Sequence, residues 1–230
     1  MLSIIIPVLN EEPNLRSLLP DLPRNCPGAE VIVVDGGSTD GTLELLRQFP
    51  FARRVLSPRG RARQMNAGAG ASRGETLLFL HADTRLPDGA LEAIHAAFAD
   101  PRIVGGRFDV RLDSPRAIFS VIAFSINLRS RLTRIATGDQ AIFVRQNIFA
   151  EMGGFPEIPL MEDVEFSTRL KRRGGIACLR LPVTASARKW EREGVLRTVL
   201  LMWTLRFLYF LGVNPTRLHR YYYGHPPSIE

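Results

Sequence analysis

Cysteine is scarce in this sequence, and long apolar runs are missing. The two cysteines, Cys26 and Cys178, lie far apart and match no spacing typical of metal ligands. The N-terminus carries no basic segment and turns polar after nine residues, which is not typical of a secretory signal peptide. With 230 residues, of which 45% are hydrophobic and 23% charged, the chain predicts one folded, cytoplasmic domain.

Lysine is also rare, because the positive charge comes almost entirely from arginine. Of the 30 basic residues only Lys171 and Lys189 are lysine, and the formal net charge is +7. One explanation is an anionic partner, since the guanidinium fork suits phosphate oxygens; the other is genome base composition. Six arginines and no acidic residue lie between positions 53 and 73. No nucleic-acid-binding motif accompanies this charge, so we expect no nucleic-acid partner.

Short apolar runs alternate with helical patterns along the chain. Strands are predicted over 3–9, 31–34, 53–56 and 76–80, with helical spacing between them. This alternation predicts βαβ units and a mainly parallel sheet, an α/β fold. Beyond about residue 100 the rhythm changes, and no linker marks a second domain. The later elements predicted there are strands over 105–112 and 141–144 and helices over 117–135 and 163–173.

The segment 196–213 is the most apolar part of the C-terminal region. Its uncharged core, between Arg197 and Arg206, has eight residues, whereas a bilayer-spanning helix needs roughly 20. We interpret the segment as a helix packed on the domain or in a homodimer contact. The alternative is a helix lying in the membrane interface, which Trp203, Tyr209 and the flanking arginines would suit.

Acidic side chains follow two of the predicted strands. Asp35 and Asp83 stand at strand ends, where open parallel sheets bind ligands, and their oxygens can accept hydrogen bonds or bind a divalent cation. A third acidic cluster lies at 161–165, where its spacing alone favours capping of the following helix. The loop with Arg59, Arg61 and Arg63 either cradles a diphosphate or is simply solvated.

Several segments, in order, resemble the inverting family-2 glycosyltransferases of GT-A fold. They are IIIPVLNEEPNL, VIVVDGGSTDGT, RGRARQMNAGAGASRGETLLFLHADTRLP and GGFPEIPLMEDVEFSTRL, from about residue 2 to residue 175. The resemblance implies a Rossmann-like nucleotide-diphospho-sugar transferase occupying 1–230 as a single domain. Its nucleotide-sugar-binding half would be 1–100 and its acceptor half 101–190, followed by a C-terminal helix and tail over 191–230. The strings HADT, TGDQAIF and SARKWEREG are similar, more narrowly, to a bacterial subgroup associated with arsenosugar biosynthesis.

The same resemblance implies roles for individual residues. The donor would be a nucleotide-diphosphate sugar, with UDP favoured, and the cofactor Mg or Mn. Asp35 would accept a hydrogen bond from the base, Asp83 would bind the cation, and Asp163 would be the general base. The remaining residues implied at the donor are Pro7, Asn10, Glu11, Gly37, Arg61, Arg63 and His81. Candidate acceptor contacts are Asp139, Gln140, Glu162 and Trp190.

One residue departs from the family pattern. His81 stands where the family's Asp-any-Asp motif has its first aspartate, and an imidazole cannot supply the missing negative charge. The processive members' Gln-any-any-Arg-Trp motif has only a faint counterpart at 188–190, which predicts transfer of a single sugar.

Two other functions stay open: a catalytically silent binding domain, favoured by His81, and a nucleotidyltransferase, which would carry a glycine-rich loop where PVLNEE stands.

Overall fold

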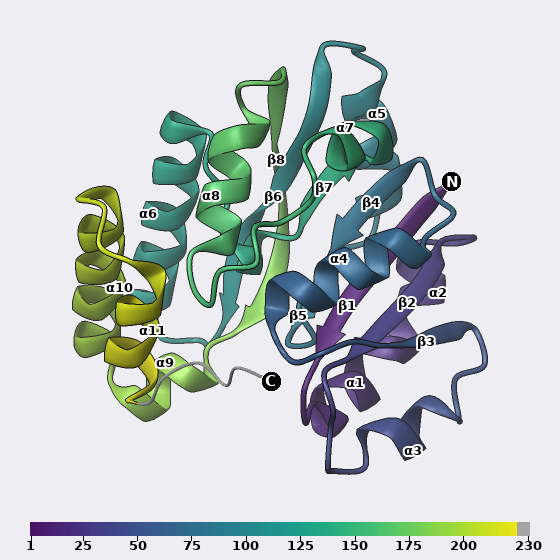
Figure 1. Ribbon diagram of the computed structural model, residues 1–230, viewed down its shortest axis with the longest axis horizontal. Helices are drawn as coiled ribbons and strands as arrows, with labels where there is room; N and C mark the ends of the chain where they lie inside the picture. Colours follow the sequence, from purple (N-terminus) through teal and green to yellow (C-terminus); the bar gives the residue numbers. More distant parts are fainter. Residues whose placement is uncertain (225–230) are drawn as a thin grey trace.

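One eight-stranded sheet runs through the computed structural model, which describes residues 1–224 (Figure 1). The strand order is β3-β2-β1-β4-β7-β6-β8-β5. Strands β1 to β4 run parallel to one another, and β7 is antiparallel to both β4 and β6. Strands β6 and β8 are parallel, and β5 is antiparallel to β8. The strands are β1 Leu2–Val8, β2 Glu30–Asp35, β3 Ala52–Leu56, β4 Thr76–Phe79, β5 Thr84–Arg85, β6 Ile103–Asp113, β7 Ile142–Arg145 and β8 Gly175–Ser186.

Helices cover both faces of this sheet (Figure 1). Two short 3₁₀ turns, Leu19–Asp21 and Gly138–Gln140, interrupt the connections. The helices are α1 Glu12–Leu18, α2 Leu22–Asn25, α3 Thr42–Leu46, α4 Arg61–Ala71, α5 Ala90–Phe98, α6 Ala117–Thr133, α7 Gln146–Glu151, α8 Glu162–Leu170, α9 Arg188–Glu193, α10 Val195–Phe210 and α11 Pro215–Tyr223.

Alternation along the central strands builds two apolar layers. In β1, Ile4 and Ile6 pack with α1, α2, α5 and α6, while Ile5 points to the opposite face and packs with α4. Successive side chains of a strand point to opposite faces, so a strand covered on both sides is apolar at every position. This explains the continuous apolar runs in β1 and β2, and it confirms the predicted α/β class with a mainly parallel sheet.

Helix α4 lies unusually close to the sheet. A Cβ on Gly68 would stand 2.5 Å from Cγ2 of Ile5 and 2.8 Å from Cγ2 of Val34, so only glycine fits there. One turn earlier, the buried amide of Gln64 donates through Nε2 to the carbonyl oxygens of Val8 (2.7 Å) and Val34 (2.9 Å). Gln64 therefore ties the ends of β1 and β2 to the first half of α4, and this fixes where the polar strand ends lie.

Three sequence-based expectations need correction here. The prediction that Arg59, Arg61 and Arg63 share a loop is wrong in part. Arg61 and Arg63 lie in the first turn of helix α4, and Arg59 lies in the loop before it. The helical spacing between the first two predicted strands, carried by leucines over 15–22, forms not one helix but α1, a 3₁₀ turn and α2, because Pro20 and Pro23 stand in the first turns of the later two. Strands β5 and β8 and helices α5, α7, α9 and α11 were not predicted. Residues 225–230 of the predicted tail lie outside the described part of the chain.

The segment predicted over 196–213 forms α10, which lies beside α6 at the edge of the molecule (Figure 1). Through Leu205 it packs against Met161, next to α8, and against Leu218 of α11. In residues 1–224 we find no helix with both the length and the apolar character that crossing a membrane requires.

A buried ion pair joins β6 to α6. Arg107 is fully buried and donates to the Asp109 carboxylate and to the carbonyl oxygen of Asn127 (3.2 Å). Arg131 of α6 donates through Nη2 to both oxygens of Asp109, at 2.8 and 2.7 Å. One carboxylate therefore balances two guanidinium groups, one of which has no access to water.

We predict that Asp109→Ala lowers the free energy of unfolding by about 3–5 kcal/mol, because it leaves the Arg107 charge buried without its counterion. Urea unfolding followed by circular dichroism would measure the change. Asp100→Ala, which removes the solvent-exposed pair with Arg102, is the control and should leave the midpoint unchanged. Equal midpoints for the two variants would contradict the assignment.

Candidate active site

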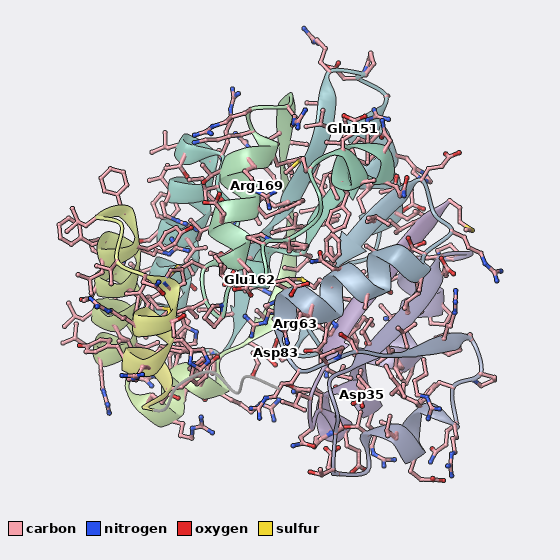
Figure 2. All side chains as sticks on the ribbon, in the orientation of Figure 1. Asp35, Arg63, Asp83, Glu151, Glu162 and Arg169 are labelled. Atoms are coloured by element: carbon pink, nitrogen blue, oxygen red, sulfur yellow. The ribbon has the colours of Figure 1, made fainter. Side chains whose placement is uncertain are left out.

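Three parallel strands deliver polar residues to one edge of the sheet. From β1 the sheet continues to β2 on one side and to β4 on the other, and at such a switch point the carboxyl ends of the strands form a crevice. Asn10 and Glu11 follow β1, Asp35 ends β2, and His81 and Asp83 follow β4. Figure 2 shows Asp35 and Asp83 toward the same end of the sheet. The predicted strand-end cluster is therefore present in the fold.

Asp35 shapes the loop that follows its own strand. Its side chain is buried, and its oxygens accept from the backbone N–H groups of Gly37 (3.0 Å) and Ser38 (3.1 and 3.2 Å). Gly37 has φ +93°, a conformation that favours glycine. A carboxylate has about four acceptor positions, so these bonds leave room for one more donor. The predicted bond to a base stays a prediction.

Asn10 and Glu11 organise the start of the crevice. Asn10 adopts a left-handed φ of 57°, which Asn tolerates well, and its Oδ1 accepts from the N–H of Thr39 at 2.8 Å. The Glu11 carboxylate accepts from Nδ2 of Asn14 at 2.5 Å. Burial raises the pKa of Glu11, and the nearby charge of Asp83 adds to the rise. Pro7 lies one residue before the end of β1, paired with Val34 of β2.

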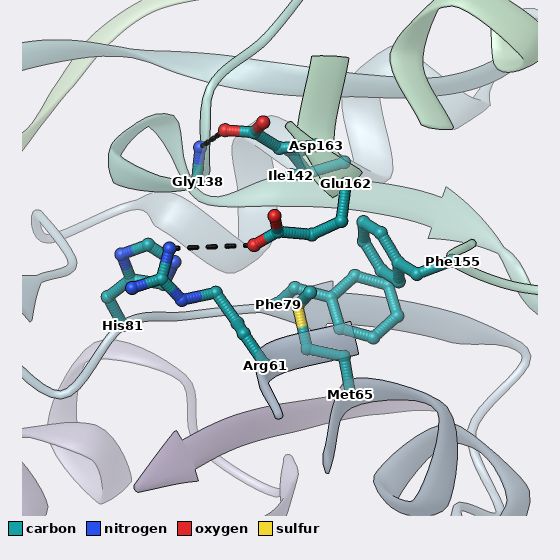
Figure 3. Close-up of a pocket in the computed structure, with 9 residues that line it drawn as sticks. All are labelled: Arg61, Met65, Phe79, His81, Gly138, Ile142, Phe155, Glu162 and Asp163. Atoms are coloured by element: carbon teal, nitrogen blue, oxygen red, sulfur yellow. Dashed lines mark hydrogen bonds and ion pairs between the residues drawn. The ribbon is translucent and has the colours of Figure 1, made fainter. Parts of the chain in front are cut away.

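His81 and Asp163 meet at Gly138 (Figure 3). The Gly138 N–H donates to Oδ2 of Asp163 at 2.8 Å. A Cβ on Gly138 would lie 2.5 Å from Nε2 and Cε1 of His81, so a larger residue there would displace the imidazole. Burial, helped by the Arg61 charge, lowers the pKa of His81 to about 3, which keeps the ring neutral. His81 therefore acts as a neutral polar group beside the acidic residue predicted to be the base.

Arg61 and Glu162 complete the same pocket (Figure 3). Glu162 is buried, and Nη1 of Arg61 lies 3.5 Å from its Oε1, whereas the Arg61 side chain is 49% exposed. Burial raises the pKa of Glu162, and the Arg61 charge opposes that rise. Met65, Phe79, Ile142 and Phe155 form the apolar floor, and the enclosed space is about 10 Å³, room for about one water molecule. Glu162 therefore anchors Arg61 rather than facing an acceptor.

Asp83 and Arg63 lie toward the open side. Asp83 is exposed, and Oδ1 accepts only a long hydrogen bond from the Thr84 hydroxyl (3.4 Å) within the described chain. Arg63 donates to Oε2 of Glu157 at 3.1 Å, so it bridges to the loop before α8. Within residues 1–224, no three His, Cys, Asp or Glu side chains are grouped as a metal site.

A second polar cluster lies on the other side of Asp163. Oδ1 of Asp139 and Nη2 of Arg129 are both buried, and neither has a hydrogen-bond partner among the described residues. Burial raises the pKa of Asp139, and it lowers that of Arg129 to about 10 with the help of the neighbouring Arg206 charge. Gln140 differs, because its side chain is fully buried and bonds the backbone and side chain of Thr137. It shapes the turn and has no exposed surface for an acceptor.

Helix α9 lies at the side of the crevice and contacts α1 and α11. Arg188 donates to Oδ1 of Asn14 on α1, and Lys189 donates to the hydroxyl of Tyr222. Burial lowers the pKa of the half-buried Lys189. The charge of Arg61 lowers it further, and the charge of Asp83 raises it. Trp190 packs against the main apolar layer, which favours the packed tryptophan over a sugar-stacking one. Sequence reasoning missed Lys189 as a site residue, although it stands next to the tryptophan that was singled out.

Comparison with known proteins agrees with this geometry. The family model "Glycosyl transferase family 2" matches residues 3–155. The chain is 32% identical over 181 residues to a PGL/p-HBAD biosynthesis glycosyltransferase of Mycobacterium bovis, covering 74% of this chain and 69% of the relative. It is also 32% identical over 126 residues to an undecaprenyl-phosphate 4-deoxy-4-formamido-L-arabinose transferase of Aeromonas hydrophila, covering 50% and 39%.

Solved structures share the fold at low sequence identity. S. aureus TarS in complex with UDP-GlcNAc superposes with a TM-score of 0.66 at 22% identity, covering 80% of this chain and 58% of TarS. The mannosyltransferase PcManGT of Pyrobaculum calidifontis, in complex with GDP-Man and Mn²⁺, gives a TM-score of 0.60 at 22% identity, covering 80% and 56%. The chain thus spans less than two thirds of these two structures. The narrower resemblance to the arsenosugar-associated subgroup stays a prediction.

Most of the sheet and the strand-end residues fall within the region that the family model matches. The family model covers well over half of the chain, and its matched region contains β1, β2 and β4 with every polar residue at their ends. The chain belongs to glycosyl transferase family 2, and it is a glycosyltransferase of GT-A fold.

Proposed function

We propose that this protein transfers one sugar from a UDP-sugar to an acceptor hydroxyl with inversion at the anomeric carbon, using Asp163 as the general base. The observation that carries the proposal is the pocket in which Asp163, His81 and Arg61 converge from three distant segments beside the strand-end crevice. UDP and UDP-GlcNAc bound to the TarS structures support a uridine nucleotide as the donor. Asp35, at the end of β2, is the residue we assign to the base.

On the donor side, three basic side chains lie near the crevice in which the diphosphate of the donor would bind. Arg61 is held by Glu162, Arg63 begins the same helix, and Lys189 approaches from α9. Donors fixed before the reaction stabilise charge that grows in the transition state without reorganising. This cluster would bind the diphosphate and favour its departure.

A divalent cation, Mg²⁺ or Mn²⁺, fits beside Asp83 only if the phosphates of the donor supply further ligands. Asp83 is the exposed carboxylate that would hold it, and the chain adds no complete ligand set of its own among the described residues. Mg²⁺ is commonly held by one or two carboxylates together with substrate phosphates, so the donor set is compatible. When bound, such a cation neutralises charge on the diphosphate.

On the acceptor side, Asp163 is positioned to take a proton. Its Oδ2 is fixed by the Gly138 N–H and its Oδ1 by the Val164 N–H at 2.7 Å, so the carboxylate has a defined orientation. In an in-line displacement the base removes the hydroxyl proton while that oxygen attacks the face opposite the leaving group. The unpartnered buried atoms of Asp139 and Arg129 line the same side and are our candidates for contacting the acceptor.

We predict that Asp163→Asn reduces sugar transfer by about 10²–10⁴-fold while UDP binding is retained, because the amide cannot accept the proton. Initial rates with a panel of UDP-sugars and calorimetric titration of UDP would measure the two effects. Glu165→Gln, on the same helix two residues later, is the matched control and should keep its activity. Asp163→Asn turning over at the wild-type rate would rule out the base.

We also predict that Asp83→Ala weakens UDP binding in the presence of Mn²⁺ by about tenfold or more and leaves binding in the presence of a chelator unchanged. Calorimetry under both conditions tests this. Asp88→Ala changes an exposed aspartate between β5 and α5 and should behave like the wild type. If Mn²⁺ strengthens binding equally in both variants, Asp83 does not hold the cation.

The second candidate, a catalytically silent binding domain, is favoured by one observation: the neutral His81 in place of a carboxylate. Release of UDP from a UDP-sugar in the presence of Mn²⁺ separates the two functions. A glycosyltransferase hydrolyses its donor slowly even without an acceptor, whereas a silent domain binds the nucleotide and releases none.

A further inference from the structure

Two neighbouring helices expose a row of large apolar side chains to solvent. We call this row, on α6 and α10, the apolar face. On α6 the side chains are 42–78% exposed, and on α10 they are 58–85% exposed. Its members are Ile118, Val121, Phe124, Leu128 and Leu132 on α6, and Leu196, Leu200, Trp203, Phe207 and Phe210 on α10.

The spacing shows that the apolar face is one side of each helix. Its residues recur every three or four positions, which places them on a single stripe. The opposite side of α6 already packs into the protein through Phe119 and Ile122, and that of α10 through Leu205. Each helix thus has two apolar sides, of which only one is covered. Contiguous exposed apolar surface of this kind marks an interaction site.

The two stripes are neighbours in space. Helix α10 lies beside α6 at the edge of the molecule (Figure 1). Ile126 of α6 and Val199 of α10 pack against the same apolar layer, so the covered sides of both helices are turned toward it. The apolar face therefore spans both helices rather than forming two separate patches.

The charged residues of α6, α10 and α11 themselves all have one sign. Residues 117–134 and 195–223, which contain α6, α10 and α11, include seven arginines and no aspartate or glutamate. Arg134, Arg197, Arg217 and Arg220 among them are exposed. A partner that covers the apolar face must therefore supply both apolar contacts and negative charge.

We propose that the apolar face docks on an anionic lipid membrane. A bilayer surface with anionic headgroups offers acyl chains to the apolar stripe and negative charge to the arginines at the same time. Tryptophan and phenylalanine at the level of the headgroups, as Trp203 and Phe210 would be, are typical of interfacial helices. A second copy of the chain fits less well, because a twofold contact would bring these arginines near one another, and α6, α10 and α11 carry no acidic side chain to pair with them.

Docking in this way leaves one helix, α10, between the membrane and the segment that carries Asp163. Helix α10 packs through Leu205 on Met161, and Tyr209 donates to Oε2 of Glu165 at 3.0 Å. Both contacts reach the segment that carries Asp163. An acceptor held in the membrane would therefore approach the base side; this last step rests on the proposed function, whereas the docking does not.

Vesicle flotation of the full-length protein tests the proposal without any activity measurement. We expect binding to phosphatidylcholine vesicles that contain about a quarter phosphatidylglycerol, and much weaker binding to phosphatidylcholine alone. The triple variant Phe124→Ser, Trp203→Ser and Phe210→Ser should bind the anionic vesicles more than about tenfold less tightly, because it removes three inserted aromatic side chains. Arg197→Gln should weaken binding by roughly fivefold, and more salt should weaken it further.

Leu56→Ser is the matched control, since Leu56 is 65% exposed on β3 and lies away from both helices. It should bind vesicles like the wild type. Circular dichroism verifies that each variant is folded, and light scattering without lipid reports the oligomeric state. Wild-type protein that ignores anionic vesicles overturns the proposal, as does vesicle binding that the triple variant keeps. A dimer that dissociates only in the triple variant, without vesicle binding, identifies a second copy as the occupant.

Discussion

Burial of β1 on both of its faces is the constraint on which the rest of the structure depends. Ile4 and Ile6 supply one apolar layer and Ile5 the other, so neither layer can form without this strand. The close approach of α4 at Gly68 follows from it, and so does the position of the crevice at the carboxyl end of β1. The apolar layers beneath the polar residues exclude water and hold these residues in place. Their electrostatic interactions are therefore stronger than they would be in water.

Sequence reasoning predicted the parts of this protein that depend on local pattern. Apolar runs ending in Asp35 and before Asp83 identified the strand ends, and the topology brought them to one edge. Contacts between residues far apart along the chain left no pattern in the sequence that could predict them. Gln64 bonds carbonyl oxygens 56 and 30 positions away, and Lys189 bonds a tyrosine 33 positions away along the sequence. Buried Arg107 reaches the carbonyl oxygen of Asn127, 20 positions away. Asp163 was identified from its motif, because spacing alone favours helix capping for an isolated acidic pair.

The exchange of a carboxylate for His81 changes the electrostatics of the pocket more than its shape. The neutral ring packs against Gly138, next to the N–H that holds Asp163. One negative charge fewer near Asp83 leaves Arg61, Arg63 and Lys189 as the larger share of the local charge. Binding of a diphosphate would then rely more on the chain's own cations and less on a metal than where the motif carries two carboxylates.

The contact between α9 and α1 has a consequence for the order of synthesis. Arg188 meets Asn14, so the two sides of the crevice come from segments 174 positions apart. The ribosome completes β1 to β4 well before α9 leaves the exit tunnel. A nascent chain therefore presents β1 to β4 with an open crevice, and the contact between α1 and α9 can form only after Arg188 has emerged.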